Sequence, residues 1–421
     1  MEDATVCYAC GARSEATDQR CSCGEPLWYD LDPQVDDWPD GDEQSMWRFA
    51  EFLPVSDPSD LAAAAGGTPL VRTSRLDDYG GCRLSVKHEG ANPTGSFKDR
   101  GSAVAVTAAR ERGVEWVGTV SHGNMAMSMA AHAAGCGLEC LTLVPDDISD
   151  ARVRAIGQFG PTLRRVDGDY GRLYYDTVER SSPETVSFTN SDSPLRTAGQ
   201  KTTALEICEA FAPDVPDAIA LPVSSGGHAS ATWKGLRELR DAGLIDAMPR
   251  LFWVQAAVCD PIAQAYREGA STVSRVESAE TVAYSIGNND PPSGTRALTA
   301  ARETDGAVVS VTEDEILDAT AALSTKAGLC VEPSSAVPLA GVRKLAREGT
   351  SPRQTTSCAS PPAPGSRNST TTRRRRTSRR SSATTSTGCC PNSRRNARQR
   401  SAVPDQRPST GVPRDSRPFE I

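Results

Sequence analysis

The chain has 421 residues, 38% of them hydrophobic, so it can bury a full core and more than one domain. Residues after Thr350 hold 15 Arg against three acids, a net charge of +12, which leaves −20 for residues 1–350. The absence of an eighteen-residue apolar run and of a basic, then apolar, leader argues against a membrane or secreted protein and leads us to expect a cytoplasmic one.

The acidic excess of residues 1–350 bears on the solvent in which the protein works. Such an excess, with only six Lys, is typical of a halophilic protein, because high salt screens most of the self-repulsion. An ordinary acidic cytosolic protein is the alternative. In a reducing cytoplasm the 13 Cys are better interpreted as metal ligands or free thiols than as a disulfide framework.

Residues 1–30 form a small cysteine-rich module. Two cysteine pairs, C-x2-C and C-x-C, are separated by ten residues, and each pair is followed by Gly: Cys7, Cys10, Cys21 and Cys23. Two such turns can direct four thiolates onto one tetrahedral zinc ion. We therefore predict a zinc-ribbon-like module, and the zinc is structural because four thiolates leave no open position for catalysis. Loose thiols in a disordered leader are the alternative.

The chain changes character after this module. Residues 31–66 are rich in Asp and Pro, which is typical of a linker. From residue 67 to 349 short apolar strands alternate with Ala-rich helices, for example 116–120 with 125–134. This alternation predicts a parallel sheet covered on both faces, which is an α/β fold.

The strongest local signal is the segment NPTGSFKDRG at residues 92–101, just before an Ala-rich helix. Lys98 falls at the start of that helix. There the positive end of the helix dipole disfavours the ammonium form and helps to free the amine for attack on an aldehyde. Taken alone, a lysine in this position is more often a solvated helix residue.

Two further segments are turns between a strand and a helix. In residues 121–125, SHGNM, Gly123 permits a tight approach and the first helical N–H groups form an anion site. In residues 222–229, small residues let backbone N–H groups cradle a phosphate at the start of a helix. The candidate residues of this loop are Ser224, Ser225, Gly226, Gly227 and His228. Each turn alone is also compatible with an ordinary glycine turn.

After Gly349 the α/β pattern stops and the chain becomes rich in Ser, Thr, Pro and Arg, with runs such as 373–376. Apolar residues are too sparse there to offset the entropy of ordering, so we predict that residues 350–421 are a disordered tail. The abrupt change of composition favours translation in a shifted reading frame over a basic arm that binds nucleic acid.

Residues 92–101 resemble the segment that carries the cofactor lysine in fold-type II pyridoxal-phosphate (PLP) enzymes. The resemblance implies that Lys98 holds PLP as a Schiff base and moves protons during the reaction. It also implies two parallel-sheet α/β domains, with a small domain at about residues 95–185 inserted in the large one within residues 67–349.

The same resemblance assigns roles to the two turns. In the family the first turn binds the substrate carboxylate, here through Ser121, His122 and Gly123, and places an Asn, here Asn124, beside the phenolic oxygen of the cofactor. The second turn, about 130 residues after the lysine, binds the cofactor phosphate. His228 is then a donor of the loop rather than a general base.

Within this family the chain is similar to threonine synthase of the short type found in archaea and some bacteria. The segments that carry the similarity are residues 190–202, 285–288 and 332–336. In threonine synthase an Asn-Ser pair and an Arg bind the phosphate of O-phosphohomoserine, which implies Asn190, Ser191 and Arg196 here. A guanidinium fork with hydroxyl and amide donors suits a dianion, although Arg196 could also be a surface charge.

Two departures from threonine synthase limit this interpretation. The chain has His122 and Met125 where Thr or Ser is usual, so a hydroxyl is lost at position 125 and the substrate could differ from O-phosphohomoserine. The closing segment of the family, a strand and a turn whose hydroxyl contacts the pyridine nitrogen, is absent after Gly349. We therefore expect one strand and one cofactor contact to be missing, which puts the activity of this chain in doubt.

The sequence thus predicts a PLP-dependent lyase that converts O-phosphohomoserine and water to threonine and phosphate. We expect a homodimer with an amino-acid substrate, PLP and one structural zinc, and no nucleic-acid or membrane partner. A threonine or serine dehydratase, or another β-elimination or β-replacement enzyme, is the first alternative. An inactive PLP fold that binds nucleic acid is the second, but the acidic body would repel phosphates.

Overall fold

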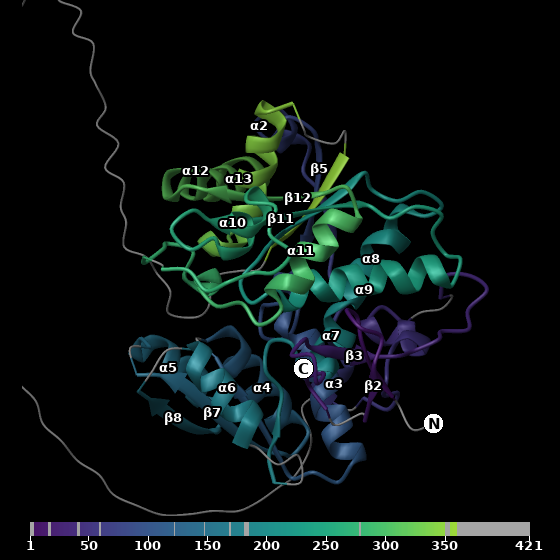
Figure 1. The fold of residues 1–421 in the computed structure, drawn as a ribbon, viewed down its shortest axis with the longest axis vertical. Coiled ribbons are helices and arrows are strands. Elements are labelled where there is room, and N and C mark those ends of the chain that lie inside the picture. The colour runs from purple at the N-terminus through teal and green to yellow at the C-terminus, as the bar shows by residue number, and fades with distance from the viewer. Residues whose placement is uncertain are drawn as a thin grey trace, which may run out of the picture. The chain divides into compact units, whose positions relative to one another are not determined.

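The computed structural model describes residues 4–15, 18–39, 43–58, 60–121, 123–146, 148–167, 170–180, 185–277, 279–349 and 354–359. The described strands form three sheets, of three, six and four strands, shown with their helices in Figure 1. The predicted α/β class is confirmed, because both larger sheets are built mainly from parallel strands with helical connections.

The largest sheet has the strand order β12-β11-β10-β13-β5-β4, and only β4 runs antiparallel to its neighbour. Its strands are β4 (Leu70–Arg72), β5 (Arg83–His88), β10 (Ala218–Pro222), β11 (Arg250–Ala256), β12 (Ala307–Val311) and β13 (Gln354–Ala359). Successive side chains of a strand point to opposite faces, so a run of apolar residues such as Ala218–Pro222 serves two cores at once.

Helices cover both faces of this sheet. Ile219 and Leu221 of β10 pack into one hydrophobic cluster with the helices α8 (Thr202–Phe211), α9 (Gly227–Asp241) and α11 (Gly294–Glu303). Ala218 and Ala220 point the other way, into a cluster with α12 (Glu313–Ala322) and α13 (Pro333–Arg347). Figure 1 shows the two groups of helices on opposite sides of the strands.

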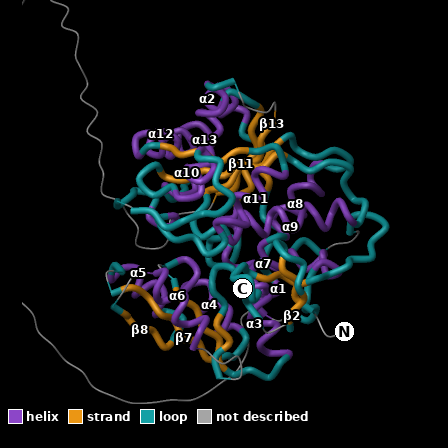
Figure 2. The backbone as a smooth tube through the Cα atoms, in the orientation of Figure 1, coloured by secondary structure: helices purple, strands orange, loops and turns teal. Residues whose placement is uncertain are grey.

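The four-stranded sheet is entirely parallel, with the order β8-β7-β6-β9. It consists of β6 (Trp116–Val120), β7 (Glu139–Pro145), β8 (Thr162–Val166) and β9 (Ser187–Phe188), with helices α3 (Lys98–Glu111), α4 (Asn124–Gly135), α5 (Asp150–Gly157) and α6 (Tyr170–Arg180). Figure 2 shows β7 and β8 beside α4, α5 and α6. The many Ala residues of α3 and α4 let these two helices pack closely against each other, which buries most of both.

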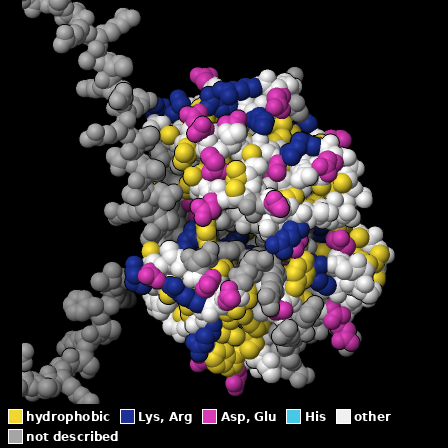
Figure 3. Space-filling view, turned by 60° about the vertical axis from the view of Figure 1, so that its left-hand side comes forward, with side chains coloured by type: hydrophobic (Ala, Val, Ile, Leu, Met, Phe, Trp, Pro, Cys, Tyr) yellow, Lys and Arg dark blue, Asp and Glu magenta, His cyan; other side chains and the backbone are white. Residues whose placement is uncertain are grey.

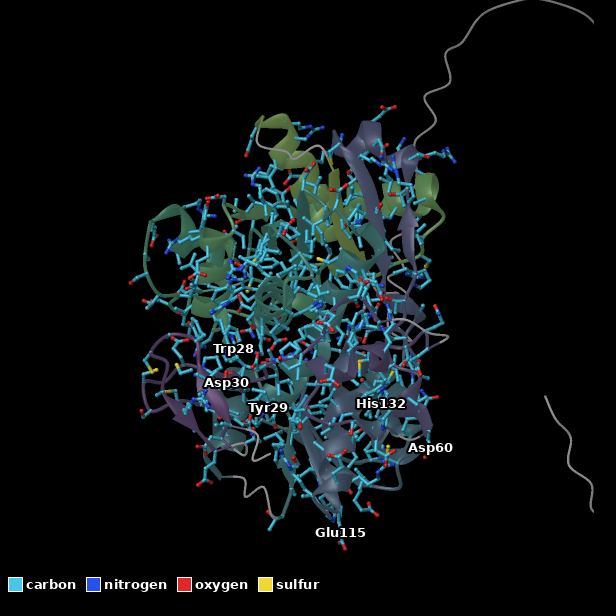
Figure 4. The ribbon with its side chains drawn as sticks, turned by 90° about the vertical axis from the view of Figure 1, so that its right-hand side faces the viewer. Trp28, Tyr29, Asp30, Asp60, Glu115 and His132 are labelled. Atoms are coloured by element: carbon cyan, nitrogen blue, oxygen red, sulfur yellow. The ribbon has the colours of Figure 1, made fainter. Side chains whose placement is uncertain are left out.

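The cysteine module folds as a small antiparallel sheet of β1 (Thr5–Cys7), β2 (Arg13–Ser14) and β3 (Leu27–Tyr29). It does not stand apart from the body. Trp28 packs on Trp233 of α9 with 5.5 Å between ring centroids, and Tyr8 packs edge-on against the same indole. Figure 4 labels Trp28 and Tyr29 where β3 meets the rest of the chain.

The segment predicted to be a linker is also packed against the body. It contains the 3-10 helix η1 (Met46–Phe52), in which Phe49 and Phe52 are each 1% exposed and belong to the hydrophobic core. The Asp- and Pro-rich composition suggested a linker. The four large apolar residues of η1 are buried, however, and they pack the segment against the body. The described residues of this segment, 31–39, 43–58 and 60–66, therefore belong to the folded unit.

The prediction of a missing closing strand is wrong. β13 pairs in parallel with both β10 and β5, and therefore lies inside the six-stranded sheet, with Thr356 and Ser357 buried. We had inferred disorder from the scarcity of apolar side chains. An interior strand is also stabilised by backbone hydrogen bonds along both edges, and Thr adopts the extended backbone readily. The packed body extends to residue 359, and the remainder of the predicted tail, with the cofactor contact expected there, lies outside the described residues.

The surface of the described part carries mixed charge. On the face drawn in Figure 3 acidic and basic side chains are interspersed. No described helix combines the length and the apolar character needed to span a bilayer.

Candidate active site

A cavity opens at the carboxyl ends of β6 and β10, where parallel strands in α/β folds present their loops to ligands. It collects segments that are far apart in the sequence. The predicted site residues that line it are Lys98, Ser121, Gly123, Asn124, Ser191, Arg196, Ser224, Ser225, Gly226, Gly227 and His228. His122 lies outside the described residues.

Lys98 is the first residue of α3 and reaches into this cavity. Burial lowers the pKa of its ammonium well below the usual value, the positive charge of Arg196 lowers it further, and Glu332 opposes the change. The sequence argument relied on the helix dipole, but desolvation is the larger cause. Burial and the charge of Arg196 both favour the neutral amine, which is the form that attacks an aldehyde.

The two residues after Lys98 hold it in place. Asp99 accepts hydrogen bonds from the Thr94 N–H, the Thr94 hydroxyl and the Ser128 hydroxyl, each at 2.6 Å, which ties the segment to α4. Arg100 is completely buried and forms ion pairs with Glu89 at 2.8 Å and with Glu206 at 2.6 Å. These contacts fix the start of α3 and thus the direction of the lysine.

The loop between β10 and α9 is shaped so that only glycine fits. A Cβ on Gly226, whose φ is +84°, would lie 2.4 Å from the carbonyl oxygen of Ser293. A Cβ on Gly227 would lie 2.1 Å from the carbonyl oxygen of Ser191. A side chain at either position would fill this cradle. Because both residues are glycine, the first N–H groups of α9 stay accessible to an anion.

His228 is the second residue of α9. Its ring stacks on Phe97 with 4.1 Å between centroids, and its Nε2 lies 3.2 Å from the Thr203 hydroxyl. Burial lowers the pKa of His228 to about 3, so the imidazole is neutral at physiological pH. A neutral ring in these contacts agrees with the prediction that His228 is not a general base.

The turn after β6 leads into α4 at the edge of the cavity. The Ser121 hydroxyl accepts a hydrogen bond from the Gly123 N–H at 3.1 Å, and Asn124 begins α4. The Asn124 amide donates weakly to Glu332, at 3.4 Å. Met125 is 3% exposed, and its sulfur lies 3.8 Å from the Ser102 hydroxyl, so a thioether stands where a hydroxyl was expected from the family.

Of the three residues predicted to bind the substrate phosphate, the structure brings two to the cavity. Ser191 and Arg196 line it, and Arg196 is only 3% exposed, so it is not the surface charge that was the alternative. When the Gln200 amide is oriented with its oxygen toward Arg196, that oxygen accepts hydrogen bonds from Arg196 Nε at 3.2 Å and Nη2 at 3.0 Å.

The predicted role of Asn190 is not supported by the geometry. Its amide oxygen accepts from the Val120 N–H at 3.0 Å, and its Nδ2 donates to the Thr177 hydroxyl at 2.8 Å. The side chain is fully buried between β6 and α6, away from the residues that line the cavity. Asn190 thus fixes the position of the next residue, Ser191, instead of facing a ligand.

Sequence reasoning gave no role to three polar side chains of the cavity wall. Glu332 accepts from the Ser285 hydroxyl at 3.0 Å, and burial raises the pKa of its carboxyl. Arg152 of α5 lines the cavity and lies over the ring of Tyr284, 4.3 Å from its centroid. Glu332 and Ser285 belong to segments that carried the family similarity, but no local pattern singles out Arg152.

The four predicted zinc ligands come together in the cysteine module. Their sulfur atoms lie within 4.8 Å of one another, with Cys7 to Cys23 and Cys10 to Cys21 at 3.6 Å. Zinc–sulfur bonds of about 2.3 Å in a tetrahedron require sulfur atoms about 3.8 Å apart. The cluster therefore fits one zinc ion.

Taken together, the donors of the cavity suit a phosphorylated aldehyde. Lys98 supplies an amine whose neutral form is favoured, the glycine cradle at the start of α9 supplies backbone N–H groups for a phosphate, and Asn124 supplies an amide that also lines the cavity. The residues present thus fit PLP.

Comparison with known proteins agrees with this site. The sequence profile of the family described as "Pyridoxal-phosphate dependent enzyme" matches residues 61–359, a range that includes β13. A threonine synthase of Methanocaldococcus jannaschii is 37% identical over 82% of this chain and 87% of its own length. Threonine synthases of Methanosarcina acetivorans and Mycobacterium tuberculosis are 38% and 35% identical over 74% and 73% of this chain, and over 77% and 84% of their own lengths.

Solved structures share the fold at lower identity. Serine racemase from Dictyostelium discoideum has a TM-score of 0.58 at 23% identity, covering 70% of this chain and 92% of that one. The processed form of threonine deaminase isoform 2 from Solanum lycopersicum has a TM-score of 0.60 at 19% identity, covering 77% and 91%. At these identities the likeness concerns the fold alone.

Proposed function

The chain belongs to the pyridoxal-phosphate dependent enzymes and is a threonine synthase-like lyase, and on that premise we propose that it releases phosphate from O-phosphohomoserine and adds water to give threonine. The observation that carries this proposal is the position of Arg196, a buried cation in the same cavity as Lys98. A guanidinium in the cavity suits the phosphate dianion that distinguishes this substrate from an unphosphorylated amino acid.

The side chains of the cavity divide the work of binding. Arg196 and Ser191 hold the phosphate of the substrate, since a guanidinium and a hydroxyl suit a dianion. The turn Ser121–Gly123–Asn124 holds the carboxylate at the start of α4, where N–H groups and the helix dipole favour an anion. The substrate is then fixed at both ends, with its reacting carbons between them.

Proton transfer falls to Lys98. Bound PLP supplies an electron sink for negative charge that develops on the substrate carbons. Desolvation lowers the pKa of Lys98 and favours its neutral amine, which can take a proton from one carbon and return it to another. Phe97, whose ring centroid is 3.7 Å from Lys98 Nζ, covers the amine on one side and limits the access of water.

Arg196→Ala tests the assignment of the substrate. We expect the turnover of O-phosphohomoserine to fall about ten- to a hundred-fold, because a charge-assisted contact is worth roughly 1.5–3 kcal/mol. Turnover of unphosphorylated threonine or serine should change much less. The measurements are phosphate release and ammonia release, side by side.

Arg154→Ala is the matched control, since Arg154 is exposed on α5. If wild-type protein releases ammonia from threonine or serine but no phosphate from O-phosphohomoserine, the dehydratase alternative replaces this proposal. Equal losses on both substrate types in Arg196→Ala would mean that Arg196 does not bind the phosphate.

We also propose that the cysteine module holds one structural zinc through Cys7, Cys10, Cys21 and Cys23. The support is the close approach of their four sulfur atoms. Metal analysis should find about one zinc per chain, and the double variant Cys7→Ser/Cys21→Ser should lose it. Cys330→Ser, an exposed thiol outside the module, is the control and should keep the metal.

A further inference from the structure

Arg20 belongs to the cysteine module, but its side chain contacts residues of the body of the protein. It immediately precedes Cys21, one of the four clustered cysteines, and its side chain is only 20% exposed. The same nitrogen, Nη2, donates to the carboxylate of Asp192 at 3.0 Å and to the carbonyl oxygen of Pro292 at 2.9 Å. One guanidinium thus ties together two segments that lie 100 residues apart in the sequence.

One acceptor adjoins a residue of the cavity wall, and the other adjoins a residue that is hydrogen-bonded to the wall. Asp192 follows Ser191, which lines the cavity. Pro292 precedes Ser293, whose N–H donates to the carbonyl oxygen of Ser225 at 2.9 Å. Arg20 therefore reaches the loop that carries Ser191 and the loop that supports the glycine cradle.

The same two loops meet each other at the cradle. The carbonyl oxygens of Ser191 and Ser293 are the atoms that a Cβ on Gly227 and Gly226 would meet. The width of the cradle is thus set by how closely these two loops approach. Holding both of them from one side, as Arg20 does, fixes that width.

A second link joins the module to this region. Arg296 is completely buried and lies 3.4 Å from the carbonyl oxygens of Pro26 and Leu27 in the module. Its Nη2 donates to the Ser293 hydroxyl at 3.2 Å. The module is therefore built into the support of the cavity at two points.

The energetics make Arg20 the stronger of the two links. Asp192 is fully buried, and its other oxygen accepts from the Tyr174 hydroxyl. A buried carboxylate that loses its cationic partner is strongly disfavoured, so removal of Arg20 should displace Asp192 and with it Ser191.

We propose that Arg20 is a positioning residue of the active site: through Asp192 and Pro292 it sets the two loops that form the cofactor-phosphate cradle and the substrate-phosphate contact. This rests on the proposed function for the role of the cradle and of Ser191. The cysteine module is then a structural part of the active site, although none of its described residues lines the cavity.

The test compares Arg20→Ala with Arg13→Ala in the full chain. Arg13 is an arginine of the same module, but its side chain is 69% exposed and pairs with Asp30 at the surface. The first measurement is a titration of cofactor-free protein with PLP, followed by absorbance. We expect about ten- to a hundred-fold weaker PLP binding in Arg20→Ala and no change in Arg13→Ala.

Hydrogen exchange provides a readout that needs no catalysis. In cofactor-free protein, Arg20→Ala should speed exchange in peptides that cover residues 189–196 and 288–296, while peptides of the α12–α13 pair stay as in the wild type. Arg20→Lys should restore part of the affinity, since an ammonium can keep the Asp192 contact but not the planar fork. With O-phosphohomoserine, KM should rise more than kcat falls.

A second variant covers the case in which Arg20→Ala does not fold. Asp192→Asn keeps the size of the side chain and an acceptor for Tyr174 but removes the charge that Arg20 pairs with, and it should weaken PLP binding in the same direction. Wild-type PLP affinity and exchange in both Arg20→Ala and Asp192→Asn would overturn the proposal. Wild-type protein that binds PLP but releases no phosphate would contradict the proposed function only, because the affinities still decide the role of Arg20.

Discussion

Lys98 and Lys201 are both shielded from bulk solvent, Lys201 completely and Lys98 in part, and their charged neighbours differ. Lys201, at the junction of α7 (Pro194–Gln200) and α8, forms an ion pair with Glu238 of α9, which also pairs with Lys234 at 2.7 Å. Lys98 faces the cavity, with the cation of Arg196 as its strongest charged neighbour and Glu332 as a weaker, opposing one. Burial is the largest influence on both pKa values.

The difference shows what makes a buried lysine reactive. Desolvation alone lowers both pKa values, but Glu238 limits the fall for Lys201, whose pKa comes to about 8, so this lysine remains mostly an ammonium at pH 7. Beside Arg196 the pKa of Lys98 is lowered well below the usual value, which favours the neutral amine. Burial lowers both pKa values, and the neighbouring charge opposes this change at Lys201 and adds to it at Lys98.

The largest effect is expected from Lys98→Ala. The variant should lose the covalently attached cofactor, seen as loss of the visible absorbance band and of the product trapped by borohydride. Turnover should fall about a hundred- to ten-thousand-fold, the usual contribution of a proton-transferring side chain. Lys201→Met, at a lysine that does not line the cavity, should keep the trapped product. A trapped cofactor in Lys98→Ala would mean that another lysine carries it.

Lys201→Met should instead affect stability. Removing one partner of a buried ion cluster is destabilising, and because Lys234 still pairs with Glu238 we expect a loss of about 1–3 kcal/mol in the free energy of unfolding. Urea unfolding measures it. The matched variant Arg13→Ala, at a surface pair, should cost well under 1 kcal/mol.

The pH dependence of that stability follows from the direction of the shift. The pKa of Lys201 is about 8 in the folded state, against 10.5 for an unperturbed lysine, so between these values the unfolded state binds more protons. The stability of the wild type, relative to Lys201→Met, should therefore rise from about pH 8 to pH 10 and stay level below about pH 7. A difference that falls over this interval would contradict the assignment.

The smallest effect is expected from Glu332→Gln. Burial raises the pKa of the Glu332 carboxyl, and the Ser285 hydroxyl, Arg152, Lys98 and the Asn124 amide oppose the shift. The variant keeps acceptors for Asn124 and Ser285 but cannot titrate. We expect less than about a tenfold loss of turnover near pH 8 and a change in the acidic limb of the pH profile. The control is Glu303→Gln, at an exposed residue of α11, which should leave the pH profile unchanged. Identical profiles for the wild type and both variants would exclude Glu332 as a titrating group.

Much of the site could be predicted because its parts are local. The glycines of the cradle, the turn after β6 and the segment around Lys98 are each continuous in the sequence, and each lies at the start of a helix. Arg152 and the roles of Glu332 and Ser285 could not be predicted in this way. Their positions depend on loops from distant parts of the chain that meet only at the cavity.

The sequence by itself determined the α/β class, the cysteine cluster and the place of Lys98, since strand and helix periods, cysteine spacing and a ten-residue segment are properties of neighbouring residues. Only the tertiary structure decided that residues 354–359 form an interior strand, that Asn190 turns away from the cavity and that Arg20 reaches the loops that support it. In each of these cases the deciding partner lies more than 60 residues away in the chain. A hydrogen bond or ion pair of that kind leaves no pattern among the neighbours of the residue.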